Sequence, residues 1–577
     1  MPRANDTAEA LLLEYADLLS ILSEDIFKPR AYEKAARAVG GYPADIAALD
    51  LKGILEVPSV GRSIGEKIRE FLETGTIATL DELRAQIPSG VRQMMSIPGL
   101  GPKKAVALYR ELGISSIDEL QHAVEAQQLA GLKGFGAKTE ENILTGIRRM
   151  RESAERVQVD VALEVAEELL GELSSLKGVS RSAYAGSLRR MVETIGDVDL
   201  LIASEPDDAG AIMDAFTSLS AVERVLAKGD TKSSVVTHGG LQVDLRIVPL
   251  DVWGAAMIYF TGSKAHNIRI REMAVRKGMK LSEYGLFQAR SGKLLVAETE
   301  EEVYERLGLP WIPPTLREDR GEIETALAGE LPMLVEPRQI KGDLHTHTNL
   351  TDGLASLEEM VEAAAELRYA YYAVTDHAPS LAMQRMTDAK ILAQRARLKE
   401  LQERYPRMTL LHGSELNIDP EGHVDWDVDF LAAFDVLVAS VHSRFNQTKE
   451  EMTRRIIRAM ENPCVHVIGH PTARLIGKRG PIECDLDEVF KAAARTGTAM
   501  EINAFPDRLD LKDEHILWAR RHGVRFAVST DAHAPVHLPL MRYGVATAQR
   551  GWLTKDDVIN TWPLAKLRRF LRKGRPG

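Results

Sequence analysis

Two histidines flank a threonine in the stretch KGDLHTHTNLTDG, residues 341–353, and an aspartate follows in the next loop. His345 and His347 are two positions apart, so on a strand their side chains point the same way and can hold one metal ion. Asp352 is close enough in the chain to join them. The spacing predicts a metal-dependent site in the C-terminal part of the chain.

Further ligand-type residues in this part each stand at the carboxyl end of an apolar segment. Seven apolar strands alternate with helices here, which predicts a small (β/α)7-type barrel whose strand ends meet at one rim. The nine residues expected at this rim are His345, His347, Asp352, His377, Glu415, His442, His470, Asp531 and His533. Nine mixed nitrogen and oxygen ligands favour a cluster of two or three transition-metal ions, Mn²⁺, Zn²⁺ or Fe²⁺.

A second acidic constellation lies upstream, in GSLRRMVETIGDVDLLI and LQVDLRI. Asp197 and Asp199 project from one face of a predicted strand, and Asp244 lies in an alternating pattern that predicts another. If the two strands are neighbours, three carboxylates converge and suit Mg²⁺, or Mn²⁺, shared with substrate phosphates. Gly186 and Ser187 then supply a turn for triphosphate oxygens, and Arg190 a phosphate clamp.

These residues must be positioned by several domains, because 577 residues exceed what one core supports. We expect two helical segments (1–84 and 85–152), a unit of alternating helices and strands (153–250), a smaller unit of helices and short strands (251–316), a linker (317–340) and the barrel (341–577). Two cysteines exclude a disulfide framework, and no apolar run reaches membrane-spanning length. We therefore expect a cytoplasmic protein without membrane contact. The net charge of −11 is only weak evidence against nucleic-acid binding.

The first 150 residues contain a repeat: VPSVGRSIGEKI (57–68), IPGLGPKKAVAL (97–108) and LKGFGAKTEENI (132–143). It resembles the helix-hairpin-helix motif of DNA-binding proteins, in which glycines let the turn approach a phosphate and helix N–H groups bind it. The alternative is plain helix packing. The first copy has Ser59 where the others have glycine. The DNA-contacting glycines implied are Gly61, Gly99, Gly101, Gly134 and Gly136.

Residues 10 to 316 resemble DNA polymerase family X, the family of polymerase beta, through the acidic motifs together with YFTGS (259–263) and SEYGL (282–286). The resemblance implies a lyase-like domain (1–84), a DNA-binding subdomain (85–152), a palm (153–250) and a nucleotide subdomain (251–316). It implies that Asp197, Asp199 and Asp244 hold two catalytic metals and that Ser187 and Arg190 hold nucleotide phosphates. It also implies roles around the incoming nucleotide for Tyr259, Phe260, Gly262 and Asn267, and a template contact for Arg271. Two departures stand out: Lys264 replaces an acid, and Gln242 replaces a basic neighbour of Asp244, which is expected to loosen control of that carboxylate.

Residues 341 to about 575 resemble the PHP (polymerase and histidinol phosphatase) domain, with all nine ligand positions filled. That family hydrolyses phosphoesters with metal-activated water. The fusion is similar to bacterial and archaeal family X polymerases with a C-terminal PHP domain. The resemblance implies a monomeric repair polymerase that fills short gaps with deoxynucleoside triphosphates. Its barrel would act as a 3′–5′ exonuclease, abasic-site endonuclease or 3′-end phosphoesterase on gapped, 3′-ended or abasic DNA.

Two other functions compete with this interpretation. A DNA-end-binding scaffold with a relic barrel would be expected to have lost metal ligands, and none is missing. A small-molecule phosphatase such as histidinol phosphatase would leave the hairpin repeats and the acidic constellation without a role.

Lys67, in GRSIGEKI, stands where family X enzymes can carry the lysine that attacks a 5′ deoxyribose phosphate through a Schiff base. That chemistry needs a neutral amine. Ser63 replaces a basic residue often found in this helix, and Glu66 could oppose deprotonation if it points inward. A solvated lysine that contacts phosphate is the alternative, so both interpretations stay open.

Overall fold

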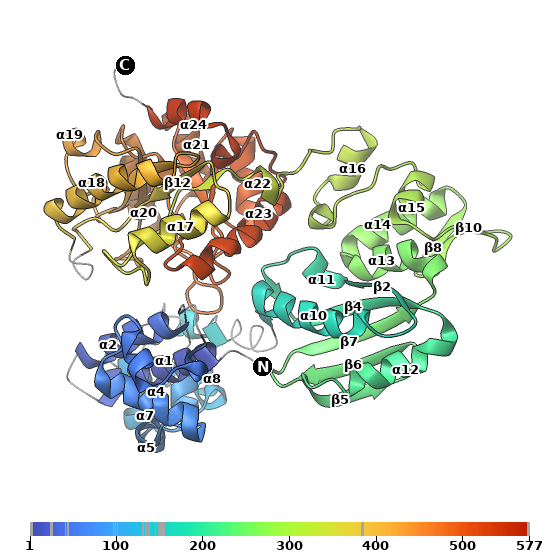
Figure 1. Cartoon of the computed structure of the whole chain (residues 1–577). Coiled ribbons are helices and arrows are strands. Elements are labelled where there is room, and N and C mark those ends of the chain that lie inside the picture. The colour runs from blue at the N-terminus through green and yellow to red at the C-terminus, as the bar shows by residue number, and fades with distance from the viewer. Residues whose placement is uncertain are drawn as a thin grey trace.

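The computed structural model describes residues 4–22, 27–40, 42, 45–95, 97, 100, 102–129, 132, 135–136, 139–144, 146–147, 156–381 and 386–573. Figure 1 shows a helical N-terminal part, a palm sheet with a smaller second sheet beside it, and a barrel in the C-terminal part. In the described part of the chain, no helix combines the length and the apolar character needed to cross a membrane.

The N-terminal part is a bundle of short helices around one apolar core. In α4, Ile64 and Ile68 are four residues apart and share one buried face, and Gly75 ends the helix in the left-handed conformation with φ of 78°. Its helices are α1 (Ala4–Leu22), α2 (Phe27–Gly40), η1 (Ile46–Ala48), α3 (Leu51–Glu56), α4 (Arg62–Thr74), α5 (Ala78–Gln86), α6 (Ser89–Met94), α7 (Pro102–Leu112) and α8 (Ile117–Glu125).

The palm is a five-stranded mixed sheet in the order β2-β4-β7-β6-β5, in which only β4 and β7 pair in parallel. Along β4, Leu200 and Ile202 pack under the helices of one face, whereas Leu201 packs toward the nucleotide subdomain. Because side chains alternate along a strand, Asp197 and Asp199 share the face of Leu201. The elements are β1 (Val157–Gln158), α10 (Val159–Ser174), β2 (Val179–Tyr184), α11 (Gly186–Arg189), β3 (Thr194–Ile195), β4 (Asp197–Ser204), α12 (Pro206–Thr217), β5 (Val222–Lys228), β6 (Lys232–Thr237) and β7 (Gln242–Val248).

The nucleotide subdomain packs helices against a three-stranded antiparallel sheet, β10-β9-β8. Its elements are η2 (Leu250–Val252), α13 (Trp253–Thr261), α14 (Lys264–Arg276), β8 (Met279–Ser282), β9 (Gly285–Gln288), β10 (Leu294–Val296), α15 (Glu300–Arg306) and η3 (Pro314–Leu316).

The segment expected to be a linker, residues 317–340, is largely folded. It contains α16 (Glu322–Leu327) and η4 (Pro337–Gln339). Ile323 and Ala326 are three residues apart on one face of α16 and are buried in the core of the nucleotide subdomain. The fully buried guanidinium of Arg317 is paired with Glu300 at 2.8 Å. The charged residues and flanking prolines suggested a solvated linker. Instead, the apolar face of α16 and the buried Arg317–Glu300 ion pair attach this segment to the nucleotide subdomain.

The barrel is a seven-stranded, all-parallel sheet in sequence order from β11 to β17. A bridge between Thr346 and Ala532 joins the two end strands, and the His347 amide donates to the Ala532 carbonyl at 2.8 Å. The strands are β11 (Gly342–Asp343), β12 (Tyr371–Val374), β13 (Thr409–Asn417), β14 (Val436–Ser440), β15 (Val467–Ile468), β16 (Ala499–Asn503) and β17 (Phe526–Ser529). The helices are α17 (Leu357–Glu366), α18 (Asp388–Arg404), α19 (Val428–Leu431), α20 (Lys449–Glu461), α21 (Leu486–Thr496), α22 (Asp513–Arg521), η6 (Pro535–Leu540), α23 (Met541–Arg550), η7 (Ile559–Thr561) and α24 (Leu564–Leu571).

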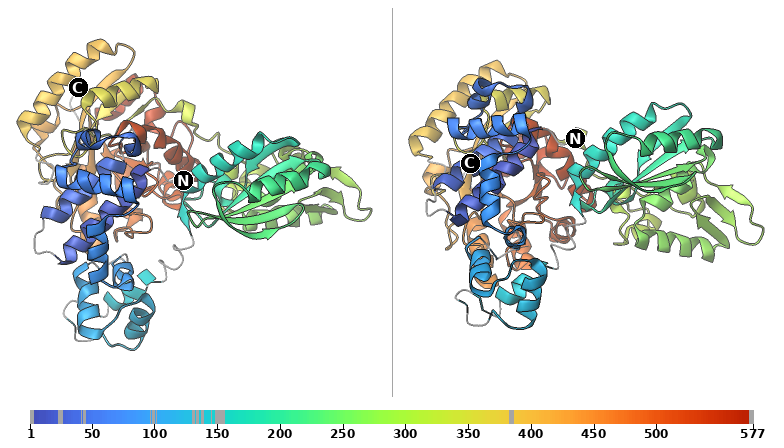
Figure 2. Two further views of the ribbon diagram at one scale, coloured as in Figure 1. Left: turned by 60° about the horizontal axis from the view of Figure 1, so that its bottom comes forward. Right: turned by 90° about the horizontal axis from the view of Figure 1, so that it is seen from below.

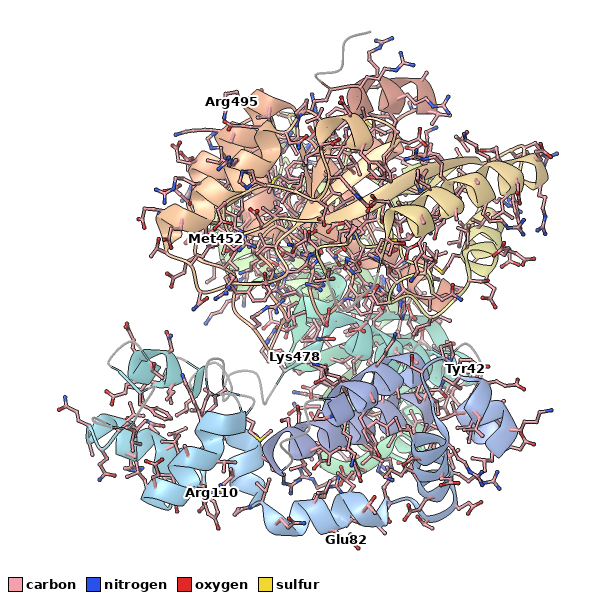
Figure 3. All side chains as sticks on the ribbon, turned by 90° about the vertical axis from the view of Figure 1, so that its left-hand side faces the viewer. Tyr42, Glu82, Arg110, Met452, Lys478 and Arg495 are labelled. Atoms are coloured by element: carbon pink, nitrogen blue, oxygen red, sulfur yellow. The ribbon has the colours of Figure 1, made fainter. Side chains whose placement is uncertain are left out.

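The barrel packs directly on the polymerase-like half. Leu509 and Tyr543 are buried in the palm core, and Trp552 is buried in the core of the nucleotide subdomain. On another side of the barrel, Leu354 packs against the core of the N-terminal helices. In Figure 2 the palm projects away from the barrel. In Figure 3, Lys478 of a barrel loop lies at the border with the N-terminal helices.

Candidate active sites

Three carboxylates converge on the palm, as the spacing of the acidic motifs predicts for neighbouring strands. Asp199 and Asp244 are direct partners in the parallel pair β4–β7, and Asp197 lies two residues before Asp199 on the same face. Burial and the neighbouring Asp197 and Asp244 charges raise the pKa of the Asp199 carboxyl to about 7. A divalent cation relieves this repulsion, so the oxygen ligands present fit Mg²⁺.

Asp244 is controlled more tightly than the sequence suggested. Lys232 on β6 places its Nζ 2.8 Å from Asp244 Oδ2, and Gln242 Nε2 donates to Asp244 Oδ1 at 2.9 Å. Burial raises the pKa of Asp244, but the hydrogen bonds from Lys232 and Gln242 outweigh burial and leave it below its ordinary value. The expectation that Gln242 loosens this carboxylate is therefore wrong, because Gln242 and Lys232 hold it together.

The turn before the acidic strand is fitted to the metal site. Gly186 has φ of 60°, and a Cβ atom there would lie 2.2 Å from Asp199 Oδ2, so only glycine fits beside this carboxylate. Ser187 follows in the short helix α11. Arg190 ends this turn with Nη1 donating to the Thr261 carbonyl at 2.6 Å and Nε donating to Glu318 at 3.0 Å.

The residues expected around the nucleotide lie together at the junction of α13 and α14. Asn267 donates from Nδ2 to the Tyr259 carbonyl at 2.7 Å, and Arg271 Nε donates to the Asn267 carbonyl at 3.1 Å. Tyr259, Asn267 and Arg271 line one small hollow. Phe260 packs edge-on against Tyr259 and beneath the guanidinium of Arg246. Gly262 has φ of 69° and leaves room for Arg190, while Lys264 is exposed at the start of α14.

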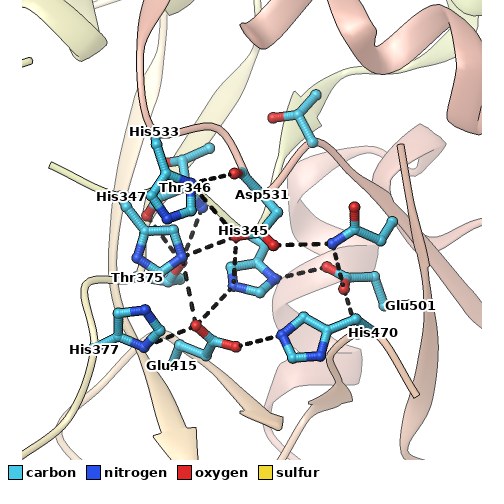
Figure 4. Close-up of polar contacts among 12 residues, drawn as sticks. His345, Thr346, His347, Thr375, His377, Glu415, His470, Glu501, Asp531 and His533 are labelled. Atoms are coloured by element: carbon cyan, nitrogen blue, oxygen red, sulfur yellow. Dashed lines mark hydrogen bonds and ion pairs between the residues drawn. The ribbon is translucent and has the colours of Figure 1, made fainter. Parts of the chain in front are cut away.

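All nine predicted rim residues gather at the carboxyl ends of the barrel strands, and Figure 4 labels all of them except Asp352 and His442. Three overlapping groups place their ligand atoms within 4.8 Å of one another. They are His347, Asp352, His377 and His533; His345, His347 and Asp531; and His377, Glu415 and His442. His470 joins through its Nε2, which lies 3.0 Å from Glu415 Oε1. Because His347 and His377 each belong to two groups, the arrangement is one continuous metal-binding cluster.

The carboxylates and histidines of the cluster shift one another's pKa values, because they are buried side by side. Burial lowers the pKa of His345, but the charges of Glu501 and Glu415 outweigh burial and hold this pKa well above its ordinary value. Burial raises the pKa of Asp531, but His345 and its histidine neighbours hold it well below the ordinary value. Within the described part of the chain, several buried ring nitrogens here make no hydrogen bond: Nε2 of His345, both nitrogens of His347, and Nδ1 of His377, His442 and His470. Buried nitrogens of this kind fit metal ions.

Comparisons with known proteins match both the N-terminal and the C-terminal half of the chain. A DNA polymerase beta thumb model matches residues 256–318, helix-hairpin-helix models match 3–77 and 91–149, and a PHP domain model matches 343–505. The DNA polymerase/3′-5′ exonuclease PolX of Bacillus subtilis (strain 168) is 36% identical over 566 residues, 98% of each chain. The chain belongs to the PolX-type family X DNA polymerases with a C-terminal PHP domain.

Two partial relatives match the separate halves. DNA polymerase lambda of Rattus norvegicus is 28% identical over 324 residues, 51% of this chain and 53% of the relative. A probable phosphatase of Thermoanaerobacter sp. (strain X514) is 30% identical over 243 residues, 40% of this chain and 94% of the relative. This family X polymerase thus joins two units that also occur apart.

Sequence reasoning missed Glu501 on β16, the one barrel strand to which it gave no ligand. Glu501 is fully buried, its Oε1 lies 2.7 Å from His345 Nδ1, and its other carboxylate oxygen accepts from the His470 amide. This contact fixes the His345 ring with Nε2 toward the cluster. Asn503, two residues later, donates to Asp531 at 3.1 Å. The acid in the middle of TAMEINA was the available signal.

Sequence reasoning also missed Arg508, which follows β16. Its Nε lies 3.7 Å from Asp531 Oδ2, and its buried Nη1 has no hydrogen-bond partner in the part of the chain that the structure describes. Burial lowers the pKa of Arg508, but Asp531 and Asp507 outweigh burial and raise it. A fixed cation with an unused donor beside a metal cluster can bind a phosphate oxygen.

The N-terminal candidates are only partly described. Lys67 lies with Nζ 5.5 Å from the ring centre of Tyr15, which stacks on Tyr32. Glu66 pairs instead with Arg62 on the exposed side of α4, at 3.0 Å. Gly61 caps α4 in an open setting, and Ser59 adopts a φ of 63° where the other repeats have glycine. Gly136 is exposed, and its carbonyl accepts from the amides of the next helical turn. Gly99, Gly101 and Gly134 lie outside the described residues.

Proposed function

We propose that this chain is a DNA-repair polymerase that fills short gaps by template-directed nucleotide addition and also hydrolyses DNA 3′ ends in its PHP domain. The observation that carries the first activity is the pairing of Asp199 with Asp244 in parallel strands, with Asp197 on the same face. Together they would hold Mg²⁺, with Mn²⁺ as a substitute, and ions bound there would supply charge neutralisation for the phosphates and activation of the primer 3′-hydroxyl.

The remaining residues of the pocket hold the nucleotide. Ser187 and Arg190 bind the β- and γ-phosphates, beside the glycines at 186 and 262. Tyr259, Phe260 and Asn267 line the sugar and base edge, and Arg271 contacts the template strand. Lys264 adds a cation beside the nucleotide where the family has an acid. The location of these side chains on two adjoining helices and one turn supports this assignment.

The barrel acts as a 3′–5′ exonuclease, and the same chemistry serves abasic-site cleavage and 3′-phosphate removal. The nine clustered side chains hold two or three ions, Mn²⁺, Zn²⁺ or Fe²⁺, which lower the pKa of bound water toward neutrality when bound. Glu501 orients His345, and Arg508 holds a non-bridging phosphate oxygen. His347 and His377 each belong to two of the three groups of ligand atoms, which supports a site for more than one metal ion.

The N-terminal 152 residues bind DNA through their hairpins, and we assign residues 1–84 to the 5′ side of a gap. The hairpin glycines let the protein backbone come close to the DNA phosphates; they are Gly61, Gly99, Gly101, Gly134 and Gly136. Because these contacts are to phosphates, DNA binding weakens as the salt concentration rises. Lys67 is the candidate nucleophile for a 5′ deoxyribose phosphate. The enzyme acts as a cytoplasmic monomer.

A separation-of-function experiment tests the proposal. Primer extension on a one-nucleotide gap and 3′ digestion of single-stranded DNA are measured for the wild type, Asp244→Ala and His345→Ala. We expect Asp244→Ala to lose extension and keep digestion, and His345→Ala to do the reverse. Extension within tenfold of wild type in Asp244→Ala, or digestion retained in His345→Ala, would refute the corresponding assignment.

A further inference from the structure

One arginine of the barrel reaches into the polymerase half. Arg550 is the last residue of α23, and only 7% of its side chain is exposed. Its Nη1 donates to the backbone carbonyl of Arg190 at 2.8 Å and to Glu318 Oε1 at 2.8 Å. Its Nε and Nη2 donate to Asp513 Oδ2 at 2.9 and 2.7 Å. Four of the five N–H donors of this guanidinium group are therefore fixed.

Arg550 and Arg190 share one carboxylate oxygen. Glu318 Oε1 accepts from Arg190 Nε at 3.0 Å as well as from Arg550. The Arg190 side chain is also held by the Thr261 carbonyl, and the exposed fractions of Arg190 and Glu318 are 14% and 16%. Within the described residues no hydrogen bond from Arg190 Nη2 is found, so this nitrogen keeps its donors for a phosphate.

The shared oxygen makes Arg550 a competitor that limits how strongly Glu318 holds Arg190. Charges alternate along the chain of contacts from Arg190 through Glu318 and Arg550 to Asp513, which also accepts from Arg320. If Arg550 is removed, Arg190 becomes the only cation bonded to Glu318 among the described residues. A carboxylate with one arginine partner prefers the two-bond fork geometry, which would occupy the donors that a phosphate needs. The backbone of Arg190 would lose its anchor as well.

Arg550 is not the group that holds the two halves together. Leu509 and Tyr543 are buried in the palm core, and Arg474 pairs with Glu193 of the palm at 2.7 Å. These contacts are independent of Arg190. Loss of Arg550 should leave the domains docked and disturb only the nucleotide side of their boundary.

We propose that Arg550 of the PHP domain is a positioning residue for the polymerase site, holding Arg190 in the orientation that receives the nucleotide phosphates. The barrel thereby contributes to nucleotide binding although it does not touch the nucleotide. This inference rests on the proposed phosphate-binding role of Arg190, and it adds a structural reason for the two activities to share one chain.

Single-nucleotide gap filling by the full-length protein tests the inference, with KM for the nucleotide and kcat measured separately. For Arg550→Met we expect KM to rise about tenfold with kcat within about twofold, because ground-state phosphate binding is lost and chemistry is not. Arg550→Lys keeps the charge but makes fewer fixed bonds, so a smaller rise of about threefold is expected. Exonuclease activity should match the wild type in both variants.

Two matched variants make the outcomes distinguishable. Glu193→Gln weakens the same domain boundary without touching Arg190, and it should leave KM unchanged. Arg190→Met reports the proposed role itself and should raise KM most.

If Arg190→Met raises KM while Arg550→Met does not, the inference is wrong and the role of Arg190 stands. If Arg190→Met has no effect on KM, the proposed role fails first. A rise in Glu193→Gln equal to that in Arg550→Met would also overturn the inference, since it would reflect domain contact in general. Should Arg550→Met fail to fold, Arg550→Lys decides by the same comparison.

Discussion

Lys232 Nζ lies 2.8 Å from Asp244 Oδ2, so the third carboxylate of the palm is paired with a lysine from the next strand. The lysine side chain is 44% exposed and that of the aspartate 13%. Such a half-buried pair contributes little to stability, but it sets the ionisation of the metal site.

Replacing Lys232 by Met should make extension depend more steeply on pH. Without the cation, the pKa values of Asp244 and Asp199 rise, so fewer sites are ready for metal at neutral pH. We expect about three- to tenfold slower extension at pH 7 and recovery at pH 9, as a shift of half to one pKa unit predicts. Lys228→Met is the control, since Lys228 pairs with Asp214 away from the triad. An equal loss at both pH values would mean that Lys232 acts on substrate instead.

The raised pKa of the Asp199 carboxyl predicts how metal binding, and the stability of the metal-free protein, depend on pH. Its pKa of about 7 in the fold exceeds the ordinary value of 3.8, so folding favours the protonated form. The stability from this group is complete below pH 3.8 and is lost as the pH rises through 7. In chelator, Asp199→Asn should therefore raise the thermal midpoint at pH 8 more than at pH 4. For the wild type, Mg²⁺ affinity measured by calorimetry should fall between pH 8 and pH 6. A pH-independent affinity would contradict the assignment.

Glu501→Gln should weaken metal binding in the barrel without altering extension. The amide cannot accept the Nδ1 proton of His345 as a carboxylate does, and loss of such an orienting partner costs about 10- to 100-fold in affinity or activity. Metal titration of the chelator-treated protein gives the affinity, and 3′ digestion at low and saturating Mn²⁺ gives the activity. Glu403→Gln, an exposed position in α18, controls for the lost charge. Wild-type metal affinity in Glu501→Gln would show that His345 needs no such partner.

Arg508→Met should slow 3′ digestion about 100-fold or less, in the range seen when one charged phosphate contact is removed. Metal content should be unchanged, because Arg508 is a cation and cannot be a ligand. The control is Arg525→Met, an arginine 45% exposed and paired with Asp557. If digestion by Arg508→Met equals that of the wild type, the unused Nη1 does not face the substrate.

Borohydride trapping on a 5′ deoxyribose phosphate decides the role of Lys67. The lyase interpretation predicts a covalent adduct that disappears in Lys67→Ala and persists in Lys28→Ala, an exposed lysine of the same domain. The position of Glu66, paired outward with Arg62, removes one obstacle to a neutral amine. Absence of an adduct in the wild type would leave Lys67 as a phosphate contact.

The sequence predicted those features of the sites that depend on the spacing of residues along one strand. The i, i+2 spacing of Asp197 and Asp199 defined one face of a strand, and nine ligand-type residues marked strand ends of the barrel. The adjacency of β4 and β7 could only be assumed, because pairing is set by the whole sheet. Lys232 and Arg550 carry no motif. Their importance comes from contacts with distant segments, which neither spacing nor composition records. The folded structure of residues 317–340 was not predicted, because the segment is rich in charged residues and its apolar face is short.

The bridge between Thr346 and Ala532 that closes the barrel has a consequence for synthesis on the ribosome. His345 and His347 are translated well before Asp531 and His533, which lie beside them in the metal cluster and are near the end of the chain. A nascent chain can thus form its palm sheet while its nuclease centre is still unassembled, since domains fold from the N-terminus onward. Products that end prematurely, before residue 533, lack a residue of the nuclease cluster, and they also lack Tyr543 and Trp552, which are buried against the palm and the nucleotide subdomain. The order of the sequence itself delays the destructive half of the enzyme.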